Sequence, residues 1–281
     1  MRRGKGDKKT RKKEAIATAV YTLDRSPRTP QQLADALFRT GAEAEPEPRP
    51  APRHKRVFAS LDGKDAALDR LAIWVDQRDG DGRHIRDRVA LTDGSHALQD
   101  QTHAHLPGFT LVLDIMHVSE YAWNAGTALY GETDPQRAVW VEVQMRDILA
   151  SRVQTVIDRL EAKAARLAKR SQAYRVLRQV ANYFRRNRPF MDYATYLRRG
   201  WPIGTGVIEG ACRHLVKDRM ELAGMRWTVP GATAVLALRA VNENGDWEAF
   251  HAFRRERRHI RLYRTAMPTA WIAHAERLEI N

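Results

Sequence analysis

Cysteine is almost absent from this 281-residue chain. The single Cys212 cannot form an internal disulfide, and the Cys-x-x-Cys pairs of a zinc ribbon are missing. The sequence also has no apolar run of 18 or more residues, no signal-type apolar segment after its basic N-terminus and no Gly-x-x-x-x-Gly-Lys loop for ATP. These absences predict a soluble, intracellular protein with no membrane partner, stabilised by packing alone.

Acidic residues are scarce relative to basic ones. The 34 Asp and Glu face 48 Lys and Arg, which gives a formal net charge of +14. A surplus of this size favours a polyanionic partner, because neutralising phosphates releases their condensed counterions. With 43% hydrophobic residues the chain can also bury a core, so a disordered protein is excluded and nucleic acid is the leading partner.

Two short apolar segments each end in an aspartate. Arg88 to Asp93 reads Arg-Val-Ala-Leu-Thr-Asp, and Thr110 to Asp114 reads Thr-Leu-Val-Leu-Asp. A short helix is expected to start between them, within residues 94–98. This order of strand, helix and strand predicts a βαβ unit with a parallel pair.

A glycine turn then delivers one glutamate at the start of a basic helix. The segment from Ile203 to Met220 reads Ile-Gly-Thr-Gly-Val-Ile-Glu-Gly-Ala-Cys-Arg-His-Leu-Val-Lys-Asp-Arg-Met. Helical spacing places Ile208, Ala211, Cys212 and Leu215 on one face and Glu209 with Arg213 and Lys217 on an adjoining one. Together with the two aspartates, Glu209 gives three carboxylates at the ends of strands and helices, which is the arrangement of a metal-dependent phosphoryl-transfer site.

Other segments complete the secondary structure. Strands are expected within residues 14–23 and 56–61, and helices within 31–39, 65–77 and 229–241, the last of them buried. Residues 43–52, with four prolines, predict a surface loop. From 117 to about 197 the pattern is helical, with a packing seam formed by Val153, Ile157, Leu160, Ala164 and Leu167.

These motifs, taken in order, resemble the DDE-type insertion-sequence transposases with an RNase H-like core, most closely the Kra-type group, relatives of the Mutator-like transposases. The second catalytic aspartate of that superfamily ends a strand before Gly, which points to Asp93. At the next strand the family has a four-residue motif, in which a Cys or Asp is followed by any two residues and then a His. Asp114 and His117 match this motif. After a helical insertion comes the glutamate, matched by Glu209. The resemblance covers roughly Lys8 to Tyr263.

The resemblance implies an α/β fold, an RNase H-like core with a large all-helical insertion. Its regions are a basic arm or loop (1–13), the first part of the core (14–117), the helical insertion (118–200), the glutamate helix (201–245) and a basic helical tail (246–281). The family's first catalytic aspartate lies on the first strand of the fold, and Asp24 fits that place badly because only one convincing strand separates it from Asp93. The chain is therefore expected to lack this aspartate, as in a truncated or decayed transposase.

The chemistry implied is cleavage and transfer of DNA strands at insertion-sequence ends, with Mg²⁺ or Mn²⁺ held by Asp93 and Glu209 as catalytic and metal-binding residues. Loss of one bridging carboxylate predicts weakened metal affinity. The resemblance also implies a homo-oligomer on DNA and a cytoplasmic, nucleoid-associated protein. DNA contacts are expected from the basic side chains that follow Glu209, namely Arg213, His214, Lys217 and Arg219.

Each candidate residue also has a structural interpretation. Asp93 is alternatively a helix-capping aspartate, and Glu209 a surface partner of Arg213. For Asp114 and His117 a hydrogen bond that fixes the strand-to-helix corner is favoured over a metal-ligand pair. Trp201 and Trp227 are expected to pack within the protein rather than to stack on unpaired bases. Cys212 is expected to be a core residue rather than a nucleophile.

Two other functions stay open. One is a non-catalytic DNA-binding remnant that uses the same basic surface and the arginine-rich helices between Ser151 and Arg199, where thirteen Lys and Arg face three acidic residues. The other is a different metallohydrolase, built on Asp114, His117 and nearby histidines, since five of the ten histidines lie between residues 84 and 117.

Overall fold

The computed structural model of the protein describes residues 13–39, 50–221 and 225–263. The basic arm expected at 1–13, except its last residue, lies outside the described residues. So do most of the proline-rich loop and the end of the basic tail. The described chain divides into two compact units, and each combines segments that are far apart in the sequence.

The first unit, which we call the Asp93 unit, comprises the described parts of Thr22–Arg53 and all of Ile85–Thr205. Its strands β3 (Val89–Thr92) and β4 (Thr110–Leu113) pair in parallel, with Thr92 opposite Leu113, and the helix between them confirms the predicted βαβ unit. Its helical elements are α1 (Pro30–Phe38), α3 (His96–His105), α4 (Ile115–Tyr130), α5 (Gln136–Leu149), α6 (Val153–Ala165), α7 (Gln172–Asn187), the 3₁₀ turn η1 (Arg188–Phe190) and α8 (Tyr193–Arg198).

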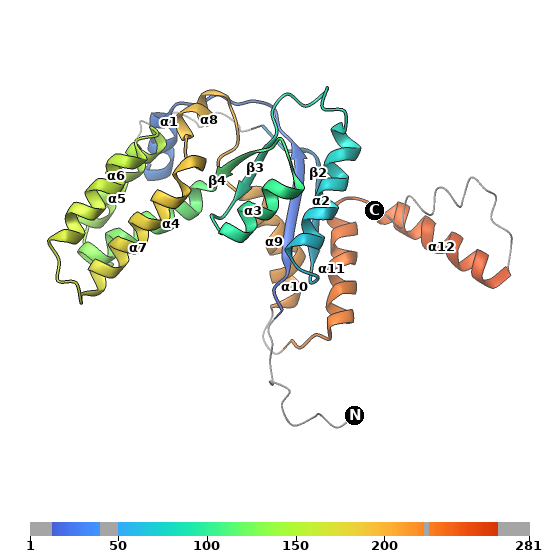
Figure 1. Cartoon of the computed structure of the whole chain (residues 1–281). Helices are drawn as coiled ribbons and strands as arrows, with labels where there is room; N and C mark the ends of the chain where they lie inside the picture. Colours follow the sequence, from blue (N-terminus) through green and yellow to red (C-terminus); the bar gives the residue numbers. More distant parts are fainter. Residues whose placement is uncertain (1–12, 40–49, 222–224, 264–281) are drawn as a thin grey trace. The chain divides into compact units, whose positions relative to one another are not determined.

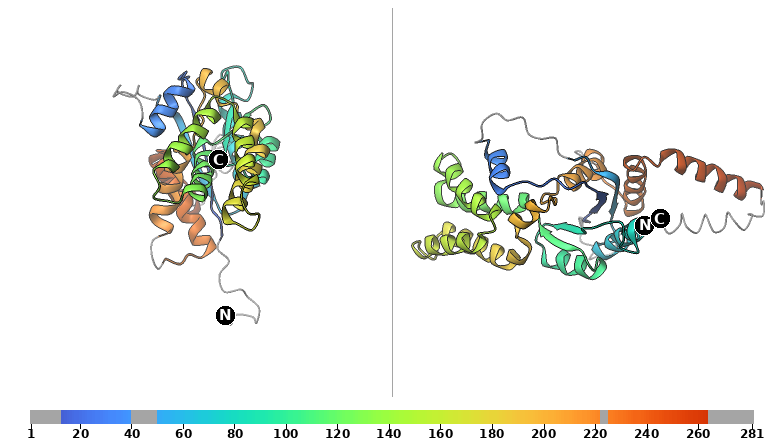
Figure 2. Two further views of the ribbon diagram at one scale, coloured as in Figure 1. Left: turned by 90° about the vertical axis from the view of Figure 1, so that its left-hand side faces the viewer. Right: turned by 90° about the horizontal axis from the view of Figure 1, so that it is seen from above.

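The helical block of this unit packs along the predicted seam. Val153, Ile157, Leu160 and Ala164 are buried along α6, which lies against α7, while α4 contacts both α5 and α7 (Figures 1 and 2). The buried Tyr193 joins this block to the small sheet, because its hydroxyl donates to the carbonyl of Leu113 over 2.8 Å. One apolar core therefore continues from the helices to β4.

The second unit, the Glu209 unit, comprises the described parts of Met1–Tyr21, His54–His84 and Gly206–Asn281. Strands β1 (Ile16–Thr22) and β2 (Arg53–Ser60), apart from one residue each at the boundary, form its two-stranded sheet. Its small core joins β2 to two helices through Val57, Ala211, Leu215 and Leu236. The helical elements are α2 (Lys64–Asp79), α9 (Gly206–Cys212), the π-helical turn η2 (Arg213–Lys217), α10 (Asp218–Met220), α11 (Val229–Glu243) and α12 (Trp247–Tyr263).

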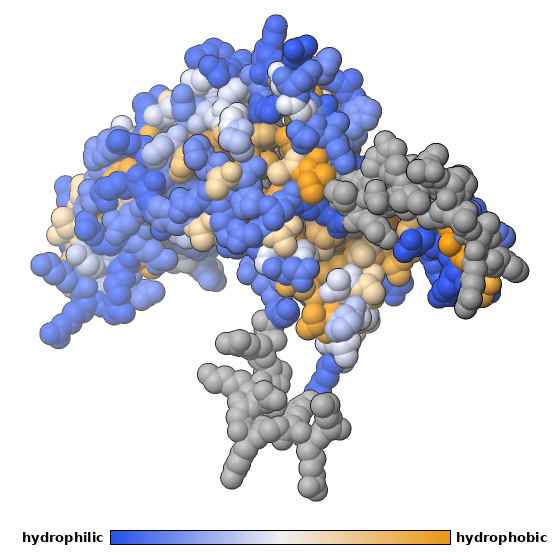
Figure 3. Space-filling view, turned by 45° about the vertical axis from the view of Figure 1, so that its right-hand side comes forward, coloured by the Kyte–Doolittle hydropathy of each residue, from blue (hydrophilic) through white to orange (hydrophobic). Residues whose placement is uncertain are grey.

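One expectation about α11 needs correction. The segment is a helix, but only the face with Ala232, Leu236 and Ala240 is buried, and Leu238 is 41% exposed. The small core of this unit contacts one side of the helix only, so apolar composition alone overestimated its burial. Figure 3 shows such apolar side chains at the surface of the molecule, next to hydrophilic ones.

The protein is thus a mixed α/β protein in which helices predominate, as predicted. The four described strands pair as two separate sheets, so they establish the α/β class without establishing an RNase H-like arrangement. Within the described ranges, none of the helices combines the length and the apolar character needed to cross a membrane.

Candidate functional site

Asp93 lies in the turn that leads from β3 into α3. Its side chain is exposed, and its Oδ1 accepts a hydrogen bond of 2.8 Å from the backbone N–H of Ser95. Gly94 follows with φ of +84°, a conformation that favours glycine. The aspartate therefore stabilises the turn in front of the helix, but it is not the capping residue of the alternative interpretation, because the N-cap of α3 is Ser95. Its carboxylate still faces solvent.

Side chains of helix α7 hold the backbone of this turn. The hydroxyl of Tyr183 donates to the carbonyl of Asp93 over 3.0 Å, and the guanidinium of Arg186 donates to the carbonyl of Gly94 over 3.0 Å. Tyr183 is itself stacked on Tyr121, with ring centroids 3.7 Å apart. Burial, with the charge of Asp93 adding to it, raises the pKa of Tyr183, so the hydroxyl stays a donor. The helical block thus positions Asp93 without engaging its carboxylate.

Asp114 is on the neighbouring strand, and parallel pairing brings it to the same edge as Asp93: its backbone N–H donates to the carbonyl of Thr92 over 2.9 Å. Its side chain, however, is fully buried. Oδ1 accepts from the N–H groups of Met116 and Thr205, each at 3.2 Å, and Oδ2 from the Thr205 hydroxyl at 2.8 Å. The carboxylate therefore caps α4 and anchors the segment that precedes the glutamate helix.

His117 completes the hydrogen bonding of Asp114. Its Nδ1 lies 2.7 Å from Oδ2 of the aspartate. Burial of the ring lowers the pKa of His117, but the hydrogen bond and the negative charge of Asp114 outweigh burial, so the net effect is a raised pKa. A carboxylate with all these donors is occupied within the protein, which favours the structural interpretation of this pair.

Glu209 lies in the first turn of α9 and is exposed. Ala211 in this helix and Leu215 in the turn η2 that follows it are buried, with Ile208 partly buried against the same core. This agrees with the apolar face that helical spacing predicted, whereas the expected continuation of the Glu209 face to Arg213 and Lys217 assumed a regular α-helix and is altered by a π-helical turn. Glu209 therefore borders the core of its unit with its carboxylate directed to the surface.

The basic residues after Glu209 do not continue as a regular α-helix. Residues 213–217 form a π-helical turn, in which positions five apart share a face, and Arg213 accordingly lies 3.6 Å from Asp218. Both the side chain and the backbone of His214 have partners. Its Nδ1 lies 3.2 Å from Oδ2 of Asp218, and the guanidinium of Arg239 in α11 donates to its backbone carbonyl. All four side chains expected to contact DNA are exposed: Arg213, His214, Lys217 and Arg219.

Three expected packing residues differ in their surroundings. Trp201 is buried and stacked on Tyr196, with centroids 5.6 Å apart, so it packs as expected. Trp227 is 42% exposed, so the expectation that it packs in the interior is wrong. Cys212 is half-buried, and burial raises the pKa of its thiol, which disfavours the reactive thiolate.

Metal-ligating side chains do not gather into a complete set in the described part of the chain. No group of three or more His, Cys, Asp or Glu side chains is placed there to hold a metal ion, and the histidines between 84 and 117 are no exception. The two exposed carboxylates of interest, Asp93 and Glu209, belong to different units. Their oxygens are the ligands that Mg²⁺ prefers, so the chemistry of the donors fits while the described donor set is incomplete.

Sequence reasoning missed the residues that hold the site. Tyr183 and Arg186 lie about ninety positions after the turn that they bind, and no local pattern links them to it. Thr205 lies inside the glycine turn that marks the glutamate helix, but its bond to Asp114 spans 91 positions.

Comparison with known proteins gives no match. No family model fits the sequence, and no curated protein or solved structure is significantly similar to it.

Proposed function

We propose that this protein is a DDE-type DNA transposase of the Kra-type insertion-sequence group, with an RNase H-like core, or a DNA-binding protein derived from one. Its reaction would be metal-dependent cleavage and transfer of DNA strands at insertion-sequence ends. The observation that carries the proposal is the turn at Asp93, at the carboxyl end of a parallel strand. Its backbone is fixed by Tyr183 and Arg186 while its carboxylate is exposed.

This arrangement supports catalysis for a physical reason. A metal-ligating carboxylate must be held at a defined position and yet remain free to coordinate an ion. Asp93 is held through its backbone, and its carboxylate is exposed with Oδ1 bonded to the Ser95 N–H, whereas Asp114 at the same edge is fully buried and bonded. We assign Asp93 and Glu209 as ligands of Mg²⁺ or Mn²⁺, which would supply activation of the attacking oxygen and relief of charge on the leaving oxygen.

A second candidate function, DNA binding without cleavage, is favoured by a different observation. In the described residues no third carboxylate or histidine joins Asp93 or Glu209 to complete a metal site. Exposed cations are nonetheless abundant, among them Lys217 and Arg219 beside Glu209 and the arginines of α7. Such a protein would bind DNA through its phosphates and leave it intact.

The experiment is a cleavage assay on DNA that carries the ends of the element, in Mg²⁺ and in Mn²⁺. The transposase proposal predicts cleavage that is lost in Asp93→Asn and in Glu209→Gln. Two matched variants, Asp100→Asn on α3 and Glu248→Gln on α12, remove an exposed carboxylate elsewhere in each unit and should retain cleavage.

The outcomes separate the two candidates. Salt-sensitive DNA binding by the wild type with no cleavage in either metal would favour the non-catalytic function. Absence of DNA binding at low salt would contradict both. Light scattering with and without end DNA tests the homo-oligomer, whose mass should be a multiple of 32.1 kDa plus the DNA.

A further inference from the structure

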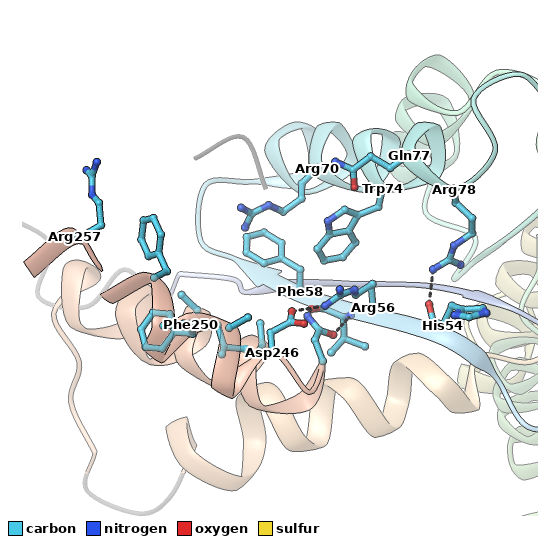
Figure 4. A pocket seen from close by; sticks show the side chains of 18 of the residues that line it. His54, Arg56, Phe58, Arg70, Trp74, Gln77, Arg78, Asp246, Phe250 and Arg257 are labelled. Atoms are coloured by element: carbon cyan, nitrogen blue, oxygen red, sulfur yellow. Dashed lines mark hydrogen bonds and ion pairs between the residues drawn. The ribbon is translucent and has the colours of Figure 1, made fainter. Parts of the chain in front are cut away.

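The Glu209 unit contains a pocket that plays no part in the proposed strand cleavage. It has a volume of about 1150 Å³ and lies between β2, α2, α11 and α12 (Figure 4). One wall carries the rings of Phe58 and Trp74, and the α11 side is lined by small apolar residues such as Ala237 and Val241. A pocket of this size exceeds what a single ion requires and suits an organic ligand.

The charged groups of the pocket are unbalanced. Four arginines line it, Arg56, Arg70, Arg78 and Arg257, against two carboxylates, Asp246 and Glu256. Arg56 is paired with Asp246, as the dashed line in Figure 4 indicates. The surplus of positive charge predicts an anionic ligand, because the guanidinium groups of Arg70 and Arg78 are partly buried and create a potential that water screens poorly.

Arg78 is the most informative of these cations. One of its terminal nitrogens donates to the carbonyl of His54, while the other, Nη1, is buried and has no hydrogen-bond partner among the described residues. Burial, followed by the positive charge of Arg56, lowers the pKa of Arg78. An oxyanion that accepts from Nη1 would satisfy this donor and offset the repulsion between the two guanidinium groups.

The aromatic wall indicates what the anion is attached to. Phe58 and Trp74 meet edge to face, with centroids 6.3 Å apart, and the guanidinium of Arg70 lies over Phe58 at 4.2 Å. Planar side chains of this kind offer surfaces on which a nucleobase stacks. Inorganic phosphate would leave this wall uncovered, and a purely apolar ligand would leave Arg78 unsatisfied.

We propose that this pocket binds a nucleotide, with its phosphate on Arg78 and Arg56 and its base against Trp74 and Phe58. The same chemistry is found in a free nucleoside monophosphate and in an unpaired nucleotide of a DNA strand. The proposal does not depend on transposase activity, because neither Asp93 nor Glu209 is among the residues that line the pocket.

The test is isothermal titration calorimetry of the full chain at low salt with EDTA, so that strand cleavage plays no part. The probes are deoxyadenosine monophosphate, deoxyadenosine, inorganic phosphate and a five-nucleotide single strand with and without its bases. The nucleotide should bind at least tenfold more tightly than the nucleoside or phosphate alone. Arg78→Gln and Trp74→Leu should each weaken it at least tenfold, whereas Lys64→Gln, which removes a charge from α2 outside the pocket, should not.

The two sources are distinguished by the single strand. If it binds much more tightly than the free nucleotide, loses that advantage without its bases and responds to the same variants, the ligand is an unpaired DNA nucleotide. Equal affinities would identify the free nucleotide. The proposal is overturned if the nucleotide binds no better than phosphate, or if Trp74→Leu binds the nucleotide as tightly as the wild type does. Circular dichroism of each variant verifies folding, and Arg70→Gln replaces any variant that fails to fold.

Discussion

At the scale of single residues, α7 holds the backbone of the turn at Asp93 and Gly94, while Oδ1 of Asp93 accepts from the backbone N–H of Ser95. The two carbonyls accept from Tyr183 and Arg186, so the aspartate keeps an exposed carboxylate. Gly94 makes the close approach of Tyr183 feasible, because a Cβ at this position would lie 2.6 Å from the tyrosine oxygen. Both conformation and space therefore require glycine here.

Gly94→Ala tests that requirement against a matched position. Gly108 has the same φ of +84°, but no atom lies within 4 Å of the place that its Cβ would take. Both alanine variants should suffer backbone strain of about 1–2 kcal/mol. Gly94→Ala should lose about 1–3 kcal/mol more, since the new methyl group meets Tyr183 and Leu113. Urea unfolding measures both, and equal losses would contradict the close packing.

The pair of Asp114 and His117 should make stability depend on pH. The pKa of His117 in the folded protein is raised above its ordinary value near 6.5. The stabilisation is therefore fully present below about pH 6.5 and is lost as the pH rises through the raised pKa. The free energy of unfolding of the wild type minus that of His117→Gln should decline over this interval. Parallel pH curves for the two proteins would refute the link.

At the scale of elements, helices α6 and α7 supply both the core and the support of the candidate site. Their buried side chains pack α7 against α6, and α7 in turn carries Tyr183 and Arg186 to the turn after β3. The π-helical turn η2 has a comparable local effect, since it brings Arg213 and Asp218 onto one face. The geometry of these helices and turns thus decides which charged side chains bond within the protein and which remain available to a ligand.

Leu160→Ala should show how much the seam contributes. Leu160 is fully buried, and removal of its side chain should cost about 2–5 kcal/mol, because it leaves a cavity between packed helices. Leu37→Ala is the matched control in the same unit, at a side chain that is 37% exposed, and should cost less than half as much. Chemical denaturation gives both values, and a small loss at Leu160 would argue against tight packing of α6.

At the scale of the whole molecule, charge is the dominant property. A formal net charge of +14 creates a positive potential that attracts any polyanion, and exposed arginines and lysines occur in both units. Attraction of this kind is independent of sequence and weakens as salt rises. It would account for the DNA binding that either proposed function requires.

The salt dependence of DNA binding should therefore reveal which cations touch phosphates. For the double variant Lys217→Gln, Arg219→Gln we expect the slope of log K against log salt to fall by about two units, since each lost phosphate contact lowers it by about 0.9. Lys55→Gln with Lys64→Gln removes the same charge elsewhere in the Glu209 unit. Fluorescence anisotropy with duplex DNA measures the slopes, and equal slopes for the two double variants would exclude this surface.

The sequence by itself determined the local features: the strands before Asp93 and Asp114, the parallel βαβ order, the seam of α6 and the apolar face of the glutamate helix. These follow from periodicity and short-range sterics, which act within a few residues. Only the tertiary structure decided that Asp114 is bonded and buried, that α7 holds the turn at Asp93 and that Arg78 keeps an unpaired donor in an aromatic pocket. Such contacts join residues far apart in the chain, and their formation depends on how the helices pack rather than on any neighbouring residue.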